Sequence, residues 1–175
     1  MKIFVETERL ILRELLPTDD TGMFELDSDL EVHRYLGNKP IQTIEQSREI
    51  IAYVRRQYID YGIGRWAVIE KSTGDFMGWS GLKFFDNAVN NHLGFYDIGY
   101  RLIKRYWGNG YATESALTVL NYGFTTLNLP VIYGMADAGN TASNNILHKI
   151  GLRFVETFDY DGILHNWYEI RRTEI

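Results

Sequence analysis

The stretch Arg105-Tyr-Trp-Gly-Asn-Gly-Tyr-Ala-Thr-Glu-Ser-Ala116 joins an apolar run, residues 98–103, to a long amphipathic helix. Gly108 and Gly110 lack a Cβ atom, so the backbone of this turn can approach a ligand closely. The helix that follows directs its unpaired N–H groups and the positive end of its dipole back toward the turn. The stretch therefore predicts an anion-binding turn, with a phosphate or pyrophosphate as its natural ligand.

Two common phosphate loops do not fit this stretch. A Walker loop requires G-x-x-x-x-G-K-[S/T], but no lysine follows either glycine. A dinucleotide fingerprint requires a third small residue at the end of G-x-G-x-x-G, where the chain has Thr113. We therefore disfavour other types of nucleotide-binding protein. The pattern that remains is R-x-x-G-x-G-Y-A, although a plain turn before a helix would also satisfy it.

That pattern resembles the pyrophosphate-binding loop Q/R-x-x-G-x-G/A of the GCN5-related N-acetyltransferases (GNAT), which binds acetyl-coenzyme A (acetyl-CoA). Just upstream, Asp97-Ile-Gly-Tyr-Arg-Leu102 resembles the family's strand segment E-I-G-Y-x-L. Downstream, Asn140-Thr-Ala-Ser-Asn-Asn-Ile-Leu-His-Lys-Ile-Gly-Leu152 is similar to its helix N-x-x-S-x-x-V-L-x-K-L-G-F. The motifs follow in family order from about residue 8 to the C-terminus, and they resemble most the ribosomal-protein N-acetyltransferase branch.

Composition limits the other classes of function. The 175 residues are 45% hydrophobic, which suits one domain spanning residues 1–175. The chain has 23 acidic residues against 18 lysines and arginines and no basic run, so we expect no nucleic-acid partner. It has no stretch of about 18 apolar residues and no basic leader followed by an apolar segment. We therefore expect a cytoplasmic protein with no membrane partner.

Metal and thiol chemistry are also disfavoured. Cysteine is absent, which excludes disulfides, thiolate metal ligands and a nucleophilic cysteine. The four histidines lack the paired spacing of a metal site, so we expect no bound metal; they are His33, His92, His148 and His165.

The apolar patterns predict strands and helices of the α/β class. The expected strands cover residues 7–15, 66–70, 76–85, 95–103, 131–136, 152–158 and 163–170. Helices are expected to begin near Thr18 and Asp19, at the capping box formed by Thr43 and Gln46, at Gly110, and at Asn140. The resulting order is βααβββαβαββ. The resemblance adds a GNAT-like fold, a mixed and mostly antiparallel central sheet with helices on both faces and a splayed strand pair.

The resemblance implies that the pantetheine arm of acetyl-CoA lies between the splayed strands, at residues 96–103 and 131–136. Its amides would pair with the backbone of Leu102 and Ile103, and a bulge N–H near Tyr100 would polarise the thioester carbonyl. Gly99 suggests such a bulge or the close approach of another backbone, or it only relieves sheet twist. The implied cofactor-binding residues are Tyr100, Leu102, Ile103, Arg105, Tyr106, Trp107, Gly108, Asn109, Gly110, Tyr111, Ala112, Asn140 and Ser143. As alternatives, Arg105 is a solvated charge and Asn140 a plain helix cap.

Acetyl transfer to an amine requires a neutral nucleophile, so an ammonium group with a pKa near ~10 must lose a proton. Asp97 matches the acidic position of the family segment and is the first candidate base, although it could only solvate a strand start. His92 is the second candidate. Glu114 more simply complements the dipole of the helix in whose first turn it lies.

The leaving thiolate needs a proton or stabilisation. Many relatives use a tyrosine seven residues after the asparagine of the N-x-x-S motif, but this chain has Leu147 there. Ser143 or a water could substitute, or the thiolate leaves unassisted, because its solution pKa is near ~8.5.

The acceptor would bind among the first two helices, the loop at residues 35–40 and the loop at residues 86–93. The candidate substrate-binding residues are Tyr35, Trp79, Phe84, His92 and Asp97. Aromatic residues there could flank an amine by cation–π contact or simply belong to the core. The net charge of −5 favours a cationic acceptor, which could be a protein N-terminal amine or a small-molecule amine such as a polyamine, amino acid or antibiotic.

Two further expectations concern class and assembly. A non-catalytic acyl-CoA-binding module or sensor is the alternative function, supported only by the missing tyrosine at position 147. A homodimer, through the terminal hairpin or an exposed strand edge, is compatible with the resemblance because relatives are often dimers.

Overall fold

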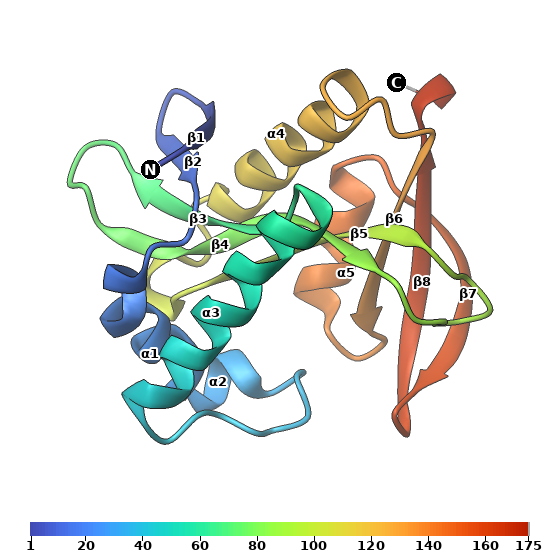
Figure 1. The fold of residues 1–175 in the computed structure, drawn as a ribbon. Coiled ribbons are helices and arrows are strands. Elements are labelled where there is room, and N and C mark those ends of the chain that lie inside the picture. Colours follow the sequence, from blue (N-terminus) through green and yellow to red (C-terminus); the bar gives the residue numbers. More distant parts are fainter. Residues whose placement is uncertain (175) are drawn as a thin grey trace.

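The computed structural model of the chain describes residues 1–174, which form an eight-stranded sheet with the order β1-β2-β3-β4-β5-β6-β8-β7 (Figure 1). All neighbouring strands are antiparallel except β5 and β6, which are parallel. The strands are β1 (Ile3–Glu6), β2 (Leu10–Arg13), β3 (Arg65–Glu70), β4 (Phe76–Phe85), β5 (Phe95–Leu102), β6 (Val131–Asp137), β7 (Arg153–Tyr160) and β8 (Ile163–Arg171). This confirms the expected mixed, mostly antiparallel sheet.

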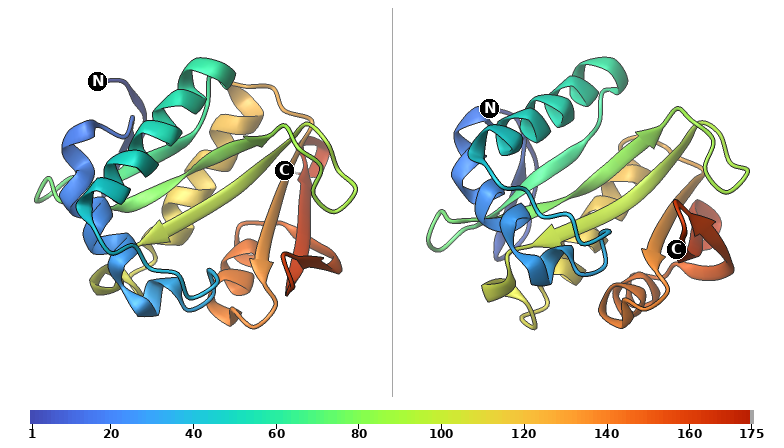
Figure 2. Two further views of the ribbon diagram at one scale, coloured as in Figure 1. Left: turned by 60° about the horizontal axis from the view of Figure 1, so that its bottom comes forward. Right: turned by 90° about the horizontal axis from the view of Figure 1, so that it is seen from below.

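Helices cover both faces of this sheet (Figures 1 and 2). They are α1 (Asp20–Ser28), α2 (Leu30–His33), α3 (Ile44–Tyr61), α4 (Tyr111–Thr125) and α5 (Thr141–Lys149), with 3-10 turns at Pro17–Asp19, Lys104–Tyr106 and Arg172–Glu174. Side chains alternate along β3, so that Ala67 and Ile69 pack with α1 and α3. Trp66 and Val68 belong to the opposite core, with α4 and α5.

The N-terminal region differs from the expectation in two respects. The strand expected at residues 7–15 is present but shorter, as β2, and β1 before it was not expected. A β1–β2 hairpin turns at Thr7, whose Oγ1 accepts a hydrogen bond from Leu10 N at 2.9 Å. The turn contains neither glycine nor proline, so the usual signal was missing. The structure also contains a short additional helix, α2, before β3. Asp29 caps the start of α2, since its side chain accepts a hydrogen bond from Glu31 N at 2.7 Å.

The expected splay between two strands is present. β5 and β6 share a single register pair, Asp97 with Tyr133. Beyond it β5 remains paired with β4 as far as Leu102, and β6 remains paired with β8 as far as Asp137. The two strands diverge from this point (Figure 2), so that their facing edges lack a strand partner.

Candidate active site

A cavity of about 770 Å³ begins in this splay and extends over the face of the sheet that α1 and α2 cover. One part is lined by the glycine turn and α5, including Trp107, Gly108, Asn140 and Ser143. The other part is lined by side chains from α2, α3, β3, β4 and β5, including Tyr35, Tyr53, Arg65, Trp79, Lys83 and Asp97. The cavity therefore joins the predicted anion-binding turn to the predicted base.

The turn presents free backbone donors. Gly108 and Gly110 have φ angles of 77° and 79°, in the left-handed region that favours glycine. Glu114 N donates to Gly110 O at 3.0 Å, which closes the first turn of α4. The amides of residues 108–113 have no acceptor within the described chain. Unpaired amides at the N-terminus of a helix fit a pyrophosphate group.

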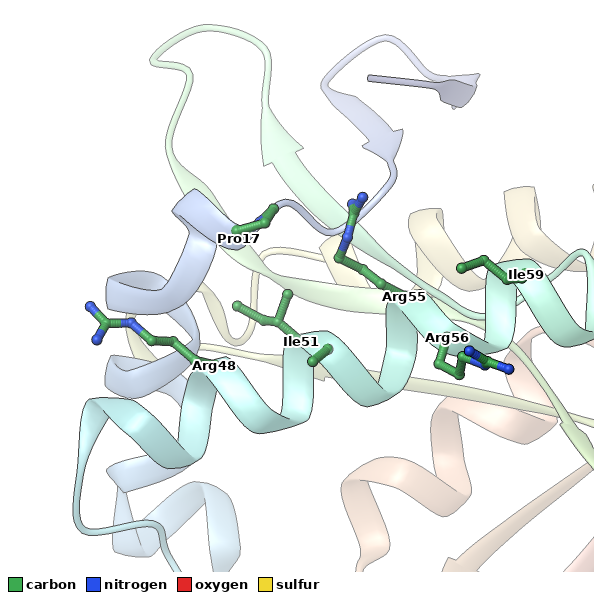
Figure 3. A pocket seen from close by; sticks show the side chains of 7 residues that line it. Pro17, Arg48, Ile51, Arg55, Arg56 and Ile59 are labelled. Atoms are coloured by element: carbon green, nitrogen blue, oxygen red, sulfur yellow. The ribbon is translucent and has the colours of Figure 1, made fainter.

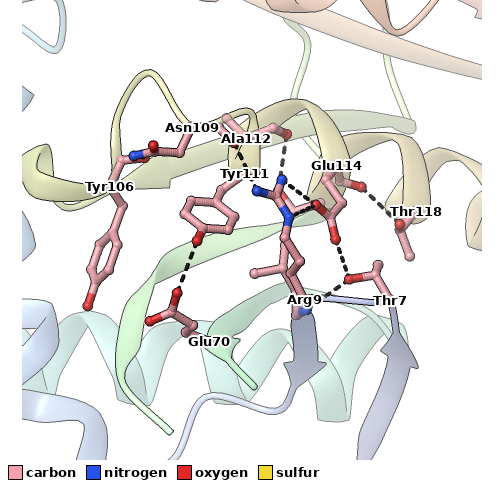
Figure 4. A network of polar contacts seen from close by, with 11 residues as sticks. Thr7, Arg9, Glu70, Tyr106, Asn109, Tyr111, Ala112, Glu114 and Thr118 are labelled. Atoms are coloured by element: carbon pink, nitrogen blue, oxygen red, sulfur yellow. Dashed lines mark hydrogen bonds and ion pairs between the residues drawn. The ribbon is translucent and has the colours of Figure 1, made fainter. Parts of the chain in front are cut away.

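A polar network holds this turn from the outside (Figure 4). Arg9 donates to Asn109 O at 3.1 Å and to Glu114 Oε2 at 2.8 Å, while Thr7 Oγ1 donates to Glu114 Oε1 at 2.5 Å. Tyr111 donates from its hydroxyl to Glu70 Oε1 at 3.0 Å. Burial alone would raise the pKa of Glu114, but the Thr7 and Arg9 contacts lower it. Glu114 thus anchors the glycine turn to the turn between β1 and β2.

The predicted cofactor-binding residues divide into two sets. The first set lines the cavity and consists of Tyr100, Leu102, Trp107, Gly108, Ala112, Asn140 and Ser143. The structure places Ile103, Arg105, Tyr106, Asn109, Gly110 and Tyr111 outside that lining. Arg105 forms an ion pair with Glu25 of α1. Leu102 O accepts from Trp107 Nε1 at 2.7 Å, and Ile103 N donates to Met77 O at 2.9 Å, so both groups already have partners.

Asn140 is a helix cap, as one of its two predicted roles required. Its Oδ1 accepts a hydrogen bond from Ser143 N at 3.1 Å at the start of α5. On the facing strand, the Tyr100 hydroxyl donates to Ser143 O at 3.0 Å and lies 3.2 Å from Ser143 Oγ. Burial raises the pKa of Tyr100, so its phenol keeps its proton at neutral pH. Tyr100 and Ser143 are thus two adjacent hydroxyl groups at the cavity wall.

Leu147 is 1% exposed and packs against the sheet. A Cβ atom at Gly134 would lie 2.9 Å from Leu147 Cδ2, so this glycine lets α5 approach β6 closely. An apolar side chain in this position supplies no proton. The Tyr100 hydroxyl was missed as a donor because only the strand register and the position of α5 bring it to Ser143.

Asp97 lies in a buried ion pair. It is 4% exposed, and its Oδ2 accepts from Arg65 Nη2 at 2.6 Å. Arg65 Nη1 also donates to Asp97 O at 2.9 Å and to Gly81 O. Burial raises the pKa of Asp97, and the Arg65 guanidinium and the Lys83 charge oppose that rise. No sequence motif marked Arg65, because its role depends on which strands are neighbours.

The ion pair between Arg65 and Asp97 leaves room only for a glycine at position 99. The β4–β5 register is uniform from Gly78 opposite Leu102 to Phe85 opposite Phe95, so the bulge expected near Tyr100 is absent from this pairing. A Cβ atom at Gly99 would lie 2.7 Å from Arg65 Nη2. The close approach is therefore made by a side chain, and the expected approach of another backbone is wrong.

Two guanidinium groups of the protein lie close to the ring of Trp79. Arg65 Cζ lies 5.2 Å and Arg101 Cζ 5.0 Å from its ring centroid, within the range of cation–π contact. Arg101 Nη1 donates to Asp27 Oδ1 at 2.6 Å, so its charge is also neutralised. The ring of Trp79 forms part of the cavity wall and already has two cationic neighbours from the protein.

Two predicted acceptor residues lie outside the cavity lining. Phe84 contacts Tyr61 and Tyr96, with ring centroids 5.1 and 5.0 Å apart, because alternation along β4 turns it away from Trp79. His92 stacks on Trp167 at 4.8 Å. Tyr35, Trp79 and Asp97 do line the cavity, together with residues from α3, β4 and the β7–β8 hairpin that the sequence did not indicate, namely Tyr53, Lys83, Tyr160 and His165.

A second hollow, of about 460 Å³, lies on the outer surface of α3 (Figure 3). Its arginines are engaged: Arg48 pairs with Asp20 at 2.7 Å, Arg56 with Asp60 at 2.9 Å, and Arg55 donates to Leu15 O at 2.6 Å. It contains none of the predicted site residues.

No group of three potential ligands among residues 1–174 is arranged to hold a metal ion. Within the same residues, no helix has both the length and the apolar character needed to cross a membrane.

Comparison with known proteins agrees with this geometry. Residues 9–153 match the model of the acetyltransferase (GNAT) domain. The chain is 32% identical over 163 residues to the uncharacterized N-acetyltransferase YoaA of Bacillus subtilis, covering 93% of this chain and 86% of that one.

Solved structures share the fold. A GNAT-family acetyltransferase from Bacillus anthracis is 25% identical with a TM-score of 0.81, covering 98% of this chain and 100% of that one. RimL, the ribosomal L7/L12 α-N-protein acetyltransferase in complex with coenzyme A, has a TM-score of 0.78 at 14% identity, covering 97% and 98%. Since the domain model matches most of the chain and the free amides of the turn fit a pyrophosphate, this protein belongs to the GCN5-related N-acetyltransferase family and is an acetyl-CoA-dependent acetyltransferase.

Proposed function

We propose that the protein transfers the acetyl group of acetyl-CoA directly to a primary amine, with both substrates bound together. The observation that carries this proposal is the continuity of the cavity, which joins the free amides of the turn to the buried carboxylate of Asp97. A shared cavity lets the amine attack the thioester without a covalent intermediate on the chain, and the chain has no cysteine to form one.

For cosubstrate binding, the amides of residues 108–112 would hold the pyrophosphate, aided by the positive end of the α4 dipole. The pantetheine arm would lie along the unpaired edge of β5 beyond Asp97, where a strand partner is missing. Ser143 and Asn140 would contact it from α5.

Asp97 is the proposed base. Its pKa is raised by burial, which makes the carboxylate a better proton acceptor than an exposed aspartate. Arg65 fixes its orientation through Oδ2, and the carboxylate lines the cavity in which the amine or a bridging water would bind. The amine nitrogen then attacks the thioester carbonyl, the C–N bond forms and the C–S bond breaks.

The Tyr100 and Ser143 hydroxyls are the proposed hydrogen-bond donors that stabilise the departing thiolate. Both line the cavity, on opposite sides of the splay, and they lie 3.2 Å apart. Because burial keeps the phenol protonated, it can donate a hydrogen bond to the thiolate through the serine hydroxyl or directly. This pair replaces the tyrosine that relatives carry at the position of Leu147.

The acceptor is a primary amine, either a protein N-terminus or a small molecule. The fold shared with RimL supports the first, since that enzyme's name describes a protein α-amine. The enclosed aromatic and charged lining around Trp79 supports the second.

The test measures free thiol released from acetyl-CoA with a panel of amines and N-terminal peptides, since the chain contributes no thiol background. We expect acceptor-dependent release, a loss of about a hundredfold or more in kcat for Asp97→Asn with acetyl-CoA affinity retained, and wild-type kinetics for Asp75→Asn, which removes an exposed carboxylate. Binding of acetyl-CoA without release from any acceptor would favour the acyl-CoA-binding sensor instead.

We further propose that the protein forms a homodimer through β7. This edge strand exposes Phe154 at 49% and Val155 at 48%, and an exposed edge with apolar residues is suited to pairing with a second copy. Sedimentation analysis should show a dimer that Val155→Lys converts to a monomer, and a monomeric wild type would refute this assignment.

A further inference from the structure

The inner part of the cavity contains an unneutralised cation. Lys83 lies on β4 and faces the cavity with Trp79 and Phe85. The guanidinium groups beside it are paired, Arg65 with Asp97 and Arg101 with Asp27, each at 2.6 Å. Lys83 has no salt-bridge partner among the residues that the structure describes. Arg65, Asp97 and Lys83 together therefore carry two positive charges and one negative, a net charge of +1.

Aromatic rings hold the Lys83 side chain in place. Its Nζ lies 4.4 Å from the ring centroid of Phe85 and 5.7 Å from that of Tyr53. Cation–π contacts compensate part of the lost hydration and restrict the side chain to one region of the cavity. A half-buried lysine without a salt-bridge partner, in a cavity that binds substrate, favours a ligand that brings a negative charge.

The phosphates of acetyl-CoA are too distant to be that anion. The glycine turn follows Leu102 at the far end of β5, whereas Lys83 is the cross-strand partner of Asp97 at the near end. Five residues of strand separate the two ends, roughly 17 Å at a rise of about 3.3 Å per residue. The anion must therefore belong to the other substrate.

The cavity lining has three further charges. Glu31 on α2 and Arg34 directly after it are both exposed and are opposite in sign. Asp137 lies beyond the splay, and its Oδ1 accepts from Gly139 N at 2.7 Å. The local charge next to Asp97 is thus opposite in sign to the net charge of −5, which had favoured a cationic acceptor.

We infer that the acceptor is a small amine that also carries a carboxylate within a few bonds of the amine, as an amino acid does. Cross-strand neighbours have Cβ atoms about 5 Å apart, so Asp97 and Lys83 can contact an amine and a carboxylate of one small molecule. Lys83 binds the carboxylate and sets specificity, while the amine lies at Asp97. This inference rests on the proposed acetyl transfer and names its substrate class.

The experiment compares each amino acid with its amide and with the amine that lacks its carboxylate, following thiol release. We expect wild type to prefer the carboxylates by about tenfold or more in kcat/KM. Lys83→Met should remove this preference through KM and keep acetyl-CoA affinity. Any change in kcat should be the same for the carboxylate and the amide substrates, because the lost Lys83 charge acts on the pKa of Asp97 equally for both. Lys83→Glu should reverse the substrate preference, so that amines lacking the carboxylate become better substrates than the amino acids. Lys149→Met, which removes an exposed charge outside the cavity, should behave as wild type.

Two results would overturn the inference while leaving acetyl transfer intact. One is a wild type that turns over polyamines or decarboxylated amines in preference to carboxylates. The other is a Lys83→Met variant that retains the carboxylate preference with unchanged KM. Absence of thiol release with every amine, despite acetyl-CoA binding, would instead count against the proposed function and remove the basis of this inference with it.

Discussion

Arg65 and Asp97 form their ion pair across an intervening strand, since Arg65 lies on β3 and Asp97 on β5. The side chain reaches its partner because Gly81 and Gly99 stand next to Arg65 in the register: Arg65 is opposite Gly81, and Gly81 is opposite Gly99. Because these two glycines have no side chain, the Arg65 guanidinium can lie over the sheet and donate hydrogen bonds to the carbonyls of Gly81 and Asp97. The orientation of the proposed base thus depends on a glycine two residues away from it.

Gly99→Ala should therefore impair catalysis. The new methyl group would lie 2.7 Å from Arg65 Nη2 and displace the guanidinium from Asp97. We expect kcat/KM to fall about tenfold to a hundredfold, because small displacements of a catalytic group have effects of that size. The measurement is a double-mutant cycle with Arg65→Ala. In that background Gly99→Ala should cost little, and an equal cost in both backgrounds would show that the glycine acts independently of Arg65.

Only part of the role of Gly99 could be predicted from the sequence. Gly99 was identifiable as a special position because glycine weakens a strand, and a local pattern supports that conclusion. The reason for it was not identifiable, because Arg65 becomes its neighbour only through the register of two hairpins. The predicted bulge was the wrong explanation of a correctly chosen residue.

The glycine turn and the acceptor part of the cavity differ in the same way. The turn and the Asn140 cap are local, so their geometry follows from residues close together in the chain and the structure contains both. The acceptor part draws on α2, α3, β4 and the β7–β8 hairpin. Aromatic side chains on adjacent positions of one strand, such as Phe84 and Phe85, face opposite sides, and only the register decides which one lines the cavity.

The stability of the protein should fall in mild acid through His33. Burial lowers the pKa of His33, the nearby charge of Arg101 lowers it further, and Asp27 only partly opposes them. Below about pH 6.5, the ordinary value for histidine, the unfolded chain binds a proton that the folded chain resists. This contribution is complete above that pH and is lost as the pH falls toward the lowered folded value. Urea unfolding at pH 8 and pH 5.5 should show a smaller loss for His33→Gln than for wild type, and equal losses would refute the effect.

Tyr100→Phe should slow the chemical step with little effect on folding. The substitution removes the hydroxyl that contacts Ser143 and keeps the partly buried ring. We expect kcat to fall about tenfold to a hundredfold while acetyl-CoA affinity stays near that of wild type. Tyr96→Phe is a matched control on the same strand, since Tyr96 lies outside the cavity lining. Unchanged kcat in Tyr100→Phe would mean that the thiolate leaves without this hydroxyl.

Gly108→Glu should abolish acetyl-CoA binding, because it adds a negative charge and strains the backbone at the glycine turn. Gly62→Glu is the control for the effect of backbone strain alone. Both glycines have positive φ angles, 77° and 71°, and a Cβ atom at either would meet no atom within 4 Å. Gly62 ends α3 and lies outside the cavity, so its substitution imposes the same backbone strain and the same charge elsewhere. Each variant should lose about 1 to 2 kcal/mol of stability.

Only Gly108→Glu places a carboxylate beside the free amides of residues 108–113, where it would repel the pyrophosphate. Isothermal titration should therefore show a loss of about a hundredfold or more in acetyl-CoA affinity for Gly108→Glu and near wild-type affinity for Gly62→Glu. Equal affinities in the two variants would mean that the turn does not bind the pyrophosphate.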